Sequence, residues 1–298
     1  MKQDAAARLS LTASMCIFAS IGLVRRWISL PSGAVALARA VIGSLFLLAL
    51  LAVKRTRPNF SILRRNGIRL ILSGAAIGLN WVLLFEAYNY TTVATATLCY
   101  YTAPIAVILV SPLLFGEKLT GRKWLCVGAA TAGIVLVSGT LEPSQHGAAE
   151  IKGILFGLGA AALYAFVIII NKKITGVPPI YRTAAQLAAA SAVLLPYTLL
   201  AEDLSSFSMT PTAAILLAVA GIVHTGVAYT LYFGSMDRLK AQTIALYSYI
   251  DPILAIILSA LVLGESLSIG GILGAILILG AAWFSERETK QNPAHIVE

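Results

Sequence analysis

Charged residues are scarce in this chain: they make up 12% of its 298 residues, against about a quarter in a soluble globular protein. A soluble fold of this length needs a charged surface to cover its core, and the sequence does not supply one. Apolar residues make up 58% of the chain instead. They gather in stretches of about twenty residues, the length at which an α-helix crosses a hydrocarbon layer of roughly 30 Å. The composition therefore predicts an all-α integral membrane protein whose main surroundings are the lipid bilayer.

The signatures of several catalytic and nucleic-acid-binding classes are also missing. The three cysteines, Cys16, Cys99 and Cys126, lie within apolar stretches and lack the spacing of metal ligands, so we interpret them as packing residues. No Walker-type glycine loop is present, which excludes ATP hydrolysis by this chain. The net charge of +9 comes from basic residues in short loops and not from a basic domain with interleaved aromatic side chains. We therefore expect no metal, no cofactor and no nucleic-acid partner.

The apolar stretches predict ten transmembrane helices. They lie at about residues 9–29, 34–53, 68–88, 93–115, 121–140, 153–171, 180–200, 212–234, 241–263 and 268–285. The first stretch lacks a small-residue cleavage pattern, so we interpret it as a membrane helix and not as a removable signal peptide. Residues 286–298 form a polar tail, for which we expect disorder. Because the connections are short, consecutive helices are expected to be neighbours.

Basic residues in the connections predict the orientation of the helices. With the amino terminus inside, the inner connections hold Lys54, Arg55, Arg57, Arg64, Arg65, Arg69, Lys118, Arg122, Lys123, Lys172, Lys173, Arg182, Arg238 and Lys240. The outer connections hold only Arg25, Arg26 and Lys152, beside the acidic Glu142, Glu150, Glu202 and Asp203. By the positive-inside rule we expect a multi-pass protein of the cytoplasmic (inner) cell membrane, with both termini in the cytoplasm.

An internal repeat is the most informative feature of the sequence. With a shift of 148 residues, Gly78–Thr120 lies over Gly226–Ser268, and fourteen of the forty-three positions match without a gap. Chance matches between Leu, Ile and Ala are common in apolar helices, but matches of proline, tyrosine and a Gly-Glu pair are not. The distinctive matches are Phe85 with Phe233, Tyr101 with Tyr249, Pro104 with Pro252, Ser111 with Ser259, and Gly116-Glu117-x-Leu119 with Gly264-Glu265-x-Leu267.

Each copy of the repeat holds five helices, at residues 9–140 and 153–285. Five is an odd number, so the second copy enters the membrane from the opposite side. The sequence therefore predicts an inverted 5+5 repeat that encloses a central cavity near the middle of the bilayer. Carriers built in this way open the cavity to one side and then to the other by alternating access.

At these residues the sequence resembles the EamA family of the drug/metabolite transporter superfamily. The motifs are Pro104 with Gly116-Glu117-x-Leu119-Thr120, the copy from Pro252 to Ser268, and Arg39 in Ala38-Arg39-Ala40. The resemblance covers nearly the whole chain and implies a ten-helix alternating-access carrier. Members of the family move amino acids, amines, nucleosides, sugars or drugs, usually outward and often with protons. The copies differ where Arg39 meets Gln186 and where Glu86 meets Gly234, so we expect a chemically lopsided cavity.

Ionisable side chains at membrane depth are costly, at roughly 2.5–3.5 kcal/mol each, and four of them are candidates for function. His224 and Asp251 lie near the middle of consecutive helices and are candidates for a pair that takes up and releases protons. The alternative is a hydrogen-bonded pair that fixes helix packing. Arg39 and Glu86 lie at similar depths near the outer ends of their helices. They are candidates for an outer salt bridge, either a gate that breaks during opening or a permanent staple.

Aromatic and polar residues at middle depth are candidates for the cavity wall, with ordinary packing as the alternative. They are Tyr247, which shares a helix face with Asp251, together with Tyr101, Trp81, Asn80, Tyr229 and Tyr164. Pro104 and Pro252 are candidates for helix hinges, because proline removes a backbone donor. Three Gly-xxx-Gly pairs, which start at Gly74, Gly153 and Gly270, permit close helix contacts, either within one chain or in a homodimer.

These features favour a secondary carrier for amino acids or related small polar metabolites, with protons as the expected coupling ion. The family resemblance implies that it is an exporter. A carrier of organic cations such as quaternary amines is the alternative, since Glu86 and Asp251 with nearby tyrosines favour a cation. Arg39 disfavours that alternative if it faces the cavity. An intramembrane enzyme needs clustered catalytic residues, and His224 with Asp251 is the one such pair, so we expect no enzymatic activity. A channel is disfavoured because no ring of filter residues is repeated.

Overall fold

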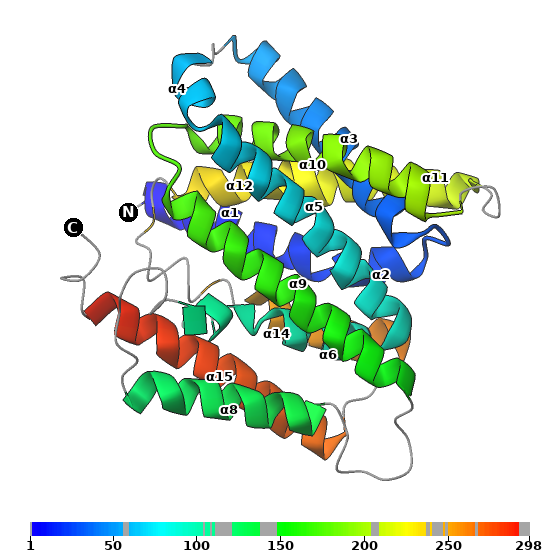
Figure 1. The fold of residues 1–298 in the computed structure, drawn as a ribbon, viewed down its shortest axis with the longest axis vertical. Helices are drawn as coiled ribbons and strands as arrows, with labels where there is room; N and C mark the ends of the chain where they lie inside the picture. Colours follow the sequence, from blue (N-terminus) through cyan, green and yellow to red (C-terminus); the bar gives the residue numbers. More distant parts are fainter. Residues whose placement is uncertain are drawn as a thin grey trace.

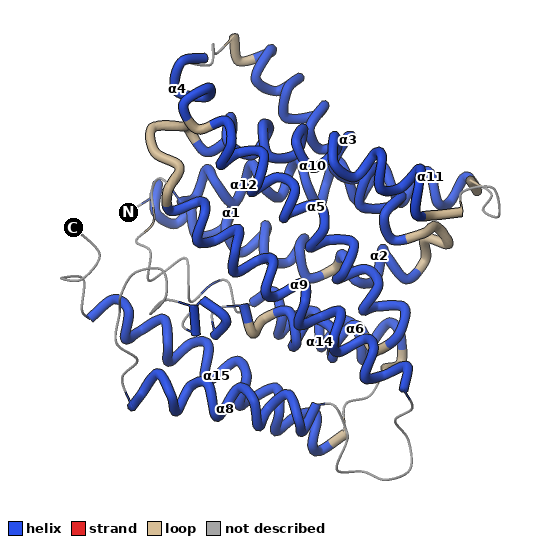
Figure 2. The backbone as a smooth tube through the Cα atoms, in the orientation of Figure 1, coloured by secondary structure: helices blue, strands red, loops and turns tan. Residues whose placement is uncertain are grey.

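The computed structural model describes residues 2–55, 60–103, 105–107, 109–110, 121–137, 148–203, 209–236, 239, 247, 250–265 and 268–291. Within these residues every element of regular secondary structure is a helix, and short loops join the helices (Figure 2). The helices are α1 (Lys2–Ala19), α2 (Ile21–Arg26), α3 (Ser32–Val53), α4 (Phe60–Arg65), α5 (Gly67–Tyr90), α6 (Val93–Tyr100), α8 (Gly121–Val137), α9 (Ala148–Lys172), α10 (Pro179–Ala201), α11 (Pro211–Gly221), the π-helix η1 (Ile222–Val227), α12 (Ala228–Met236), α14 (Ile250–Leu263) and α15 (Ile269–Gln291).

Six helical segments of the described chain are long and apolar enough to cross a membrane. They are Ala5–Arg26, Ser32–Val53, Gly67–Tyr90, Ala148–Asn171, Pro179–Ala201 and Pro211–Tyr232. Shorter apolar helices of 10–17 residues lie in α8, in α14, in α15 and in the segment that begins with α6. An all-helical fold with several membrane-spanning helices is therefore as predicted, whereas a count of ten crossings stays a prediction.

Two predicted helices differ in detail from the observed ones. The helix predicted at 9–29 is divided at Ser20, between α1 and α2. The helix predicted at 212–234 contains the π-helix Ile222–Val227 in its middle. At the other end of the chain, α15 continues to Gln291, so the first part of the expected disordered tail is helical.

Helices far apart in the sequence pack side by side. Helix α5 lies between α9 and α10, and α10 also packs on α3. Helix α1 packs on α12 and α14, while α6 contacts α9 and α14. Helices α8 and α15 form a pair at one edge of the bundle (Figure 1). The main apolar core joins α3, α5 and α10 through fully buried side chains such as Leu47, Phe85 and Leu194.

Glycines bring these helices close together. A Cβ on Gly74 would collide with the backbone carbonyl of Gln186 in α10, and one on Gly78 would lie 3.0 Å from Leu194. On α9, a Cβ on Gly153 would lie 2.8 Å from the side chain of Thr91, and one on Gly157 would lie 2.9 Å from Cys99. Two of the Gly-xxx-Gly pairs therefore serve contacts within one chain. The homodimer stays a prediction.

Candidate functional site

The π-helix η1 places two polar side chains inside the bundle. In its wider turn, Thr225 Oγ1 donates to the carbonyl of Ala220 at 3.0 Å, and His224 Nδ1 donates to that of Val219 at 3.3 Å. Both acceptors lie five residues earlier, which is the π-helical spacing. Thr225 and His224 are buried, at 0% and 3% exposure. Single π-turns inside α-helices occur frequently at functional sites.

Helix α3 can approach the π-helix because small residues face it. A Cβ on Gly43 would lie 2.5 Å from Thr225 Cγ2. In the opposite direction, Cβ atoms on Gly221 and Gly226 would collide with the side chains of Ile42 and Phe46. The three glycines thus allow α3 to lie directly against η1, where Arg39 of α3 reaches Thr225.

Arg39 is buried at the contact between α3, η1 and α5. Its Nε donates a hydrogen bond of 2.8 Å to Thr225 Oγ1. Its guanidinium carbon lies 4.1 Å from the centroid of the Trp81 ring, which gives a cation–π contact. The side chain is 4% exposed, and a guanidinium stays protonated in proteins. Arg39 is therefore a positive charge held inside the bundle.

Asp251 lies in the first described turn of α14 and is half-buried. Its Oδ2 accepts a hydrogen bond of 2.7 Å from the hydroxyl of Tyr101. The structure does not bring His224 to Asp251: His224 Nε2 contacts Ser20 Oγ at 3.0 Å instead. The two candidates for a proton-carrying pair therefore have separate partners in this conformation.

Each of the other predicted wall residues contacts a residue or helix of the opposite half of the chain or belongs to a ring cluster that does so. The Tyr164 ring lies 5.2 Å from that of Tyr100, which in turn lies 5.9 Å from Tyr101. Asn80 Nδ2 donates to the carbonyl of Ala160 at 2.5 Å, and the Tyr229 ring lies 5.3 Å from Phe18. Tyr247 packs in an apolar cluster with Leu11 and Met15 of α1.

The two proline hinges stay predictions. Pro104 lies outside the described residues. Pro252 is buried in the first described turn of α14, which begins at Ile250. Proline is tolerated in the first turn of a helix, because the amide it lacks has no intrahelical partner there.

Arg39 and Glu86 do not form the salt bridge that we expected, in any part of the chain that the structure describes. Arg39 turns towards Thr225 and Trp81, whereas Glu86 accepts a long hydrogen bond of 3.5 Å from Asn89. The reason is the rotation of the helices, which directs Arg39 into the bundle and Glu86 towards the end where α2 and α10 finish.

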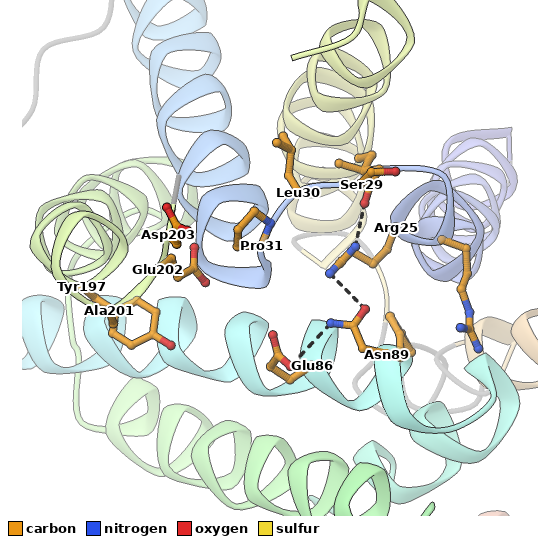
Figure 3. Close-up of a pocket in the computed structure, with 13 residues that line it drawn as sticks. Arg25, Ser29, Leu30, Pro31, Glu86, Asn89, Tyr197, Ala201, Glu202 and Asp203 are labelled. Atoms are coloured by element: carbon orange, nitrogen blue, oxygen red, sulfur yellow. Dashed lines mark hydrogen bonds between the residues drawn. The ribbon is translucent and has the colours of Figure 1, made fainter. Parts of the chain in front are cut away.

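A polar pocket of about 640 Å³ lies at that end (Figure 3). We call it the Arg25 pocket. Its lining residues are Arg25, Arg26, Ile28, Ser29, Leu30, Pro31, Glu86, Tyr88, Asn89, Tyr197, Ala201, Glu202 and Asp203. Of the functional-site residues predicted from the sequence, only Glu86 lines the Arg25 pocket. The sequence contained a signal for this pocket, because four of its charged residues belong to the predicted outer connections: Arg25, Arg26, Glu202 and Asp203.

Three carboxylates of the second half bind the first half at the same end of the bundle. Both Glu202 oxygens accept backbone N–H groups at the start of α3, from Gly33 at 2.6 Å and Ala34 at 2.9 Å. Glu150 accepts from Thr91 Oγ1 at 2.6 Å. The third carboxylate is Glu265.

Glu265 forms the largest set of these contacts. It pairs with Arg26 at 2.7 Å and accepts the backbone N–H of Val93 at 2.9 Å, as well as a hydrogen bond from Ser259. The Val93 amide belongs to the start of α6, so Glu265 joins the second half of the chain to the first. Its counterpart Glu117 lies outside the described residues.

Known proteins resemble this chain over most of its length. The model of the EamA-like transporter family matches residues 6–139 and again residues 151–286. The uncharacterized transporter YxxF of Bacillus subtilis (strain 168) is 28% identical over 295 residues, which cover 98% of this chain and 93% of that protein. The protein RarD of Salmonella typhi is 27% identical over 245 residues, or 79% of this chain and 78% of RarD.

A third relative and one solved structure extend the comparison. An uncharacterized transporter of Archaeoglobus fulgidus is 30% identical over 205 residues, 68% of this chain and 70% of that protein. A crystal structure with 19% sequence identity has the same fold, with a TM-score of 0.65 over 96% of this chain and 98% of the other. Since the family model matches most of the chain, this membrane protein belongs to the EamA-like transporter family.

Proposed function

We propose that this transporter is a secondary carrier that exports amino acids or related small polar metabolites by alternating access, coupled to protons. Two observations carry the proposal: the buried group of Arg39, Trp81 and Thr225, and the hydrogen bond between Tyr101 and Asp251. Arg39, Trp81 and Tyr101 belong to the first half of the chain, and Thr225 and Asp251 to the second. A substrate bound between these residues would contact both halves of the chain, so its contacts would change when the two halves move relative to each other.

The packing of the helices supports an inverted repeat as the basis of that movement. We match α1, α3, α5, α6 and α8 of the first half, in order, with α9, α10, α11–α12, α14 and α15 of the second. The contact of α5 with α9 then corresponds to that of α1 with α12, and α6 with α9 to α1 with α14. The contacts α3–α10, α6–α14 and α8–α15 map onto themselves. A two-fold pseudo-axis would produce this exchange, and we propose that the axis lies in the membrane plane because each copy has an odd number of predicted helices.

The chemistry of the central group favours a substrate with both charges over an organic cation. A guanidinium binds a carboxylate through two parallel hydrogen bonds, and the Asp251 carboxylate can accept an ammonium group. The face of Trp81, which would attract a quaternary amine, is already covered by Arg39. The side chains of Asp251 and His224 can take up protons, and we assign the coupling to them. In the membrane, the orientation with both termini in the cytoplasm places the Arg25 pocket on the outer side.

Transport by purified protein in proteoliposomes tests the proposal. A panel of labelled amino acids, amines and quaternary amines is offered with and without a proton gradient. We expect amino acids to be moved, and we expect Asp251→Asn to abolish proton-driven flux while the protein still folds and inserts. Tyr181→Phe is the control, because the Tyr181 hydroxyl has no hydrogen-bond partner within the described part of the chain. Wild-type flux by Asp251→Asn across a range of pH would reassign the carboxylate to packing. A covalently changed product would indicate an enzyme instead.

A further inference from the structure

The Arg25 pocket contains a positive and a negative charge that do not touch. Arg25 is 5% exposed and lies at the contact of α2, α3 and α5. Its Nη1 donates to the carbonyl of Ile28 at 2.9 Å, and its Nη2 donates to Ser32 Oγ at 3.1 Å and to Asn89 Oδ1 at 3.2 Å. Its Nε is buried and has no hydrogen-bond partner among the residues that the structure describes. A buried guanidinium with a donor left over is unusual.

Asn89 bridges this arginine to a carboxylate. Its amide oxygen faces Arg25, and its amide nitrogen donates to Glu86 Oε2 at 3.5 Å and to Ser32 Oγ at 3.4 Å (Figure 3). The Asn89 side chain therefore presents an acceptor to the cation and a donor to the anion. A zwitterion presents the same polarity with full charges, and bonds between charged groups are about twice as strong as neutral ones. Asn89 is exposed, so it can swing out of the way.

We propose that the Arg25 pocket is a second binding site, for zwitterionic α-amino acids. The carboxylate of the ligand takes the place of the Asn89 amide oxygen and supplies an acceptor to the unfilled side of Arg25. The ammonium group takes the place of the amide nitrogen next to Glu86. The volume of about 640 Å³ lies within the usual range for small-molecule sites, roughly 300–1,000 Å³. Tyr197 and Leu30 supply apolar wall for a side chain.

The role of this site at the mouth of a transport route rests on the proposed function. The binding of an amino acid depends only on contacts in the Arg25 pocket. It shares no residue with the central group of Arg39 and Asp251. Damage to the central group should therefore leave binding at the Arg25 pocket intact.

A thiol-protection assay reads out the pocket directly. Ser29, which is exposed and lines the pocket, is replaced by cysteine (Ser29→Cys) in a Cys16→Ala background and labelled with a polar maleimide in lipid nanodiscs. L-leucine, isoamylamine and 4-methylpentanoate are compared as ligands, because the last two each lack one charge. We expect leucine to slow labelling about fivefold or more, and the other two to have little effect.

Three further variants separate the proposal from a structural role of these residues. Glu86→Gln should raise the half-protecting leucine concentration about tenfold. Asn89→Ala should not raise this concentration, because the Asn89 amide only competes with the ligand. If Arg25, Asn89 and Glu86 had a purely structural role, both variants would weaken protection. Glu150→Gln, which removes a carboxylate at the same end but outside the pocket, is the control.

Two results would overturn the site: equal protection by the amine or the acid, or protection that Glu86→Gln leaves unchanged. Protection that persists in Asp251→Asn while transport is lost shows that the two sites are separate. If the wild type proves to transport no amino acid and leucine still protects Ser29→Cys, the proposed function fails and the pocket stands.

Discussion

The hydroxyl of Tyr101 donates a 2.7 Å hydrogen bond to the carboxylate of Asp251. This bond joins the end of α6 to the start of α14 and therefore links the two halves of the chain. It also places a donor next to the carboxylate that we propose as the proton carrier. A change in the bond should affect transport more than folding.

Tyr101→Phe removes that donor and leaves the ring in place. We expect proton-driven flux to fall about tenfold or more, since a hydrogen bond to a charged group contributes about 1.5–3 kcal/mol and 1.36 kcal/mol corresponds to a factor of ten. The measurement is flux in proteoliposomes at several pH values. Tyr181→Phe loses a hydroxyl for which the described residues offer no hydrogen-bond partner, and this variant should transport as the wild type does. Equal flux in both variants would show that the Tyr101–Asp251 bond has no part in transport.

Thr225→Val tests the support of Arg39. Valine keeps the shape of threonine but offers no acceptor to Arg39 Nε, so a buried donor loses its partner. We expect the free energy of unfolding to fall by about 1–3 kcal/mol, measured by reversible denaturation in detergent micelles. Thr225→Ser keeps the oxygen and should lose less stability than Thr225→Val. The opposite order would mean that the methyl group, and not the hydrogen bond, holds the site together.

Gly43→Ala tests the approach of α3 to the π-helix. The new Cβ would lie 2.5 Å from Thr225 Cγ2, and overpacking of this kind costs about 1–3 kcal/mol. Thr225→Ser removes Cγ2, so it should restore part of the stability lost in Gly43→Ala. Gly128→Ala is the control, because open space surrounds that helical glycine; it should be neutral or stabilising by up to about 1 kcal/mol. A neutral Gly43→Ala would contradict the close contact.

A double-mutant cycle on Arg26 and Glu265 tests the ion pair between α2 and the residues that follow α14. The Arg26 side chain is 33% exposed and that of Glu265 is 14% exposed, so solvent screens the pair. We expect Arg26→Gln with Glu265→Gln to give a coupling energy of about 1 kcal/mol or less. Glu265→Gln alone should cost more than Arg26→Gln alone, because Val93 and Ser259 also lose a charged acceptor. Equal single effects would show that those two bonds contribute nothing measurable.

Much of the fold was predictable because membrane insertion depends on local properties. A helix crosses lipid when its own residues are apolar over a sufficient length, and the segments predicted at 34–53, 68–88, 153–171 and 180–200 are long apolar helices in the structure. The family was also recognisable from local motifs that occur twice. The π-helix at Ile222–Val227 was not predictable from the same local properties, because one wider turn leaves the apolar segment apolar.

The candidate site was predictable only as a set of residues. Arg39, Trp81, Tyr101 and Asp251 were all named from the sequence, because ionisable and aromatic side chains at membrane depth are conspicuous. Their partners were not: Arg39 was expected to meet Glu86, and His224 to meet Asp251. Thr225 and Ser20 were missed, since hydroxyl residues in apolar helices are common and carry no charge that stands out.

The sequence by itself determined that this protein lies in a membrane, where its long helices run and which family it belongs to, because hydrophobic length and short motifs act within a few turns of the chain. Only the tertiary structure decided which charges meet. Arg39 reaches Thr225 across 186 positions and Glu265 reaches Val93 across 172, and these pairings depend on how each helix is rotated about its own axis. That rotation is set by glycine contacts and side-chain packing between distant helices, which no local pattern records.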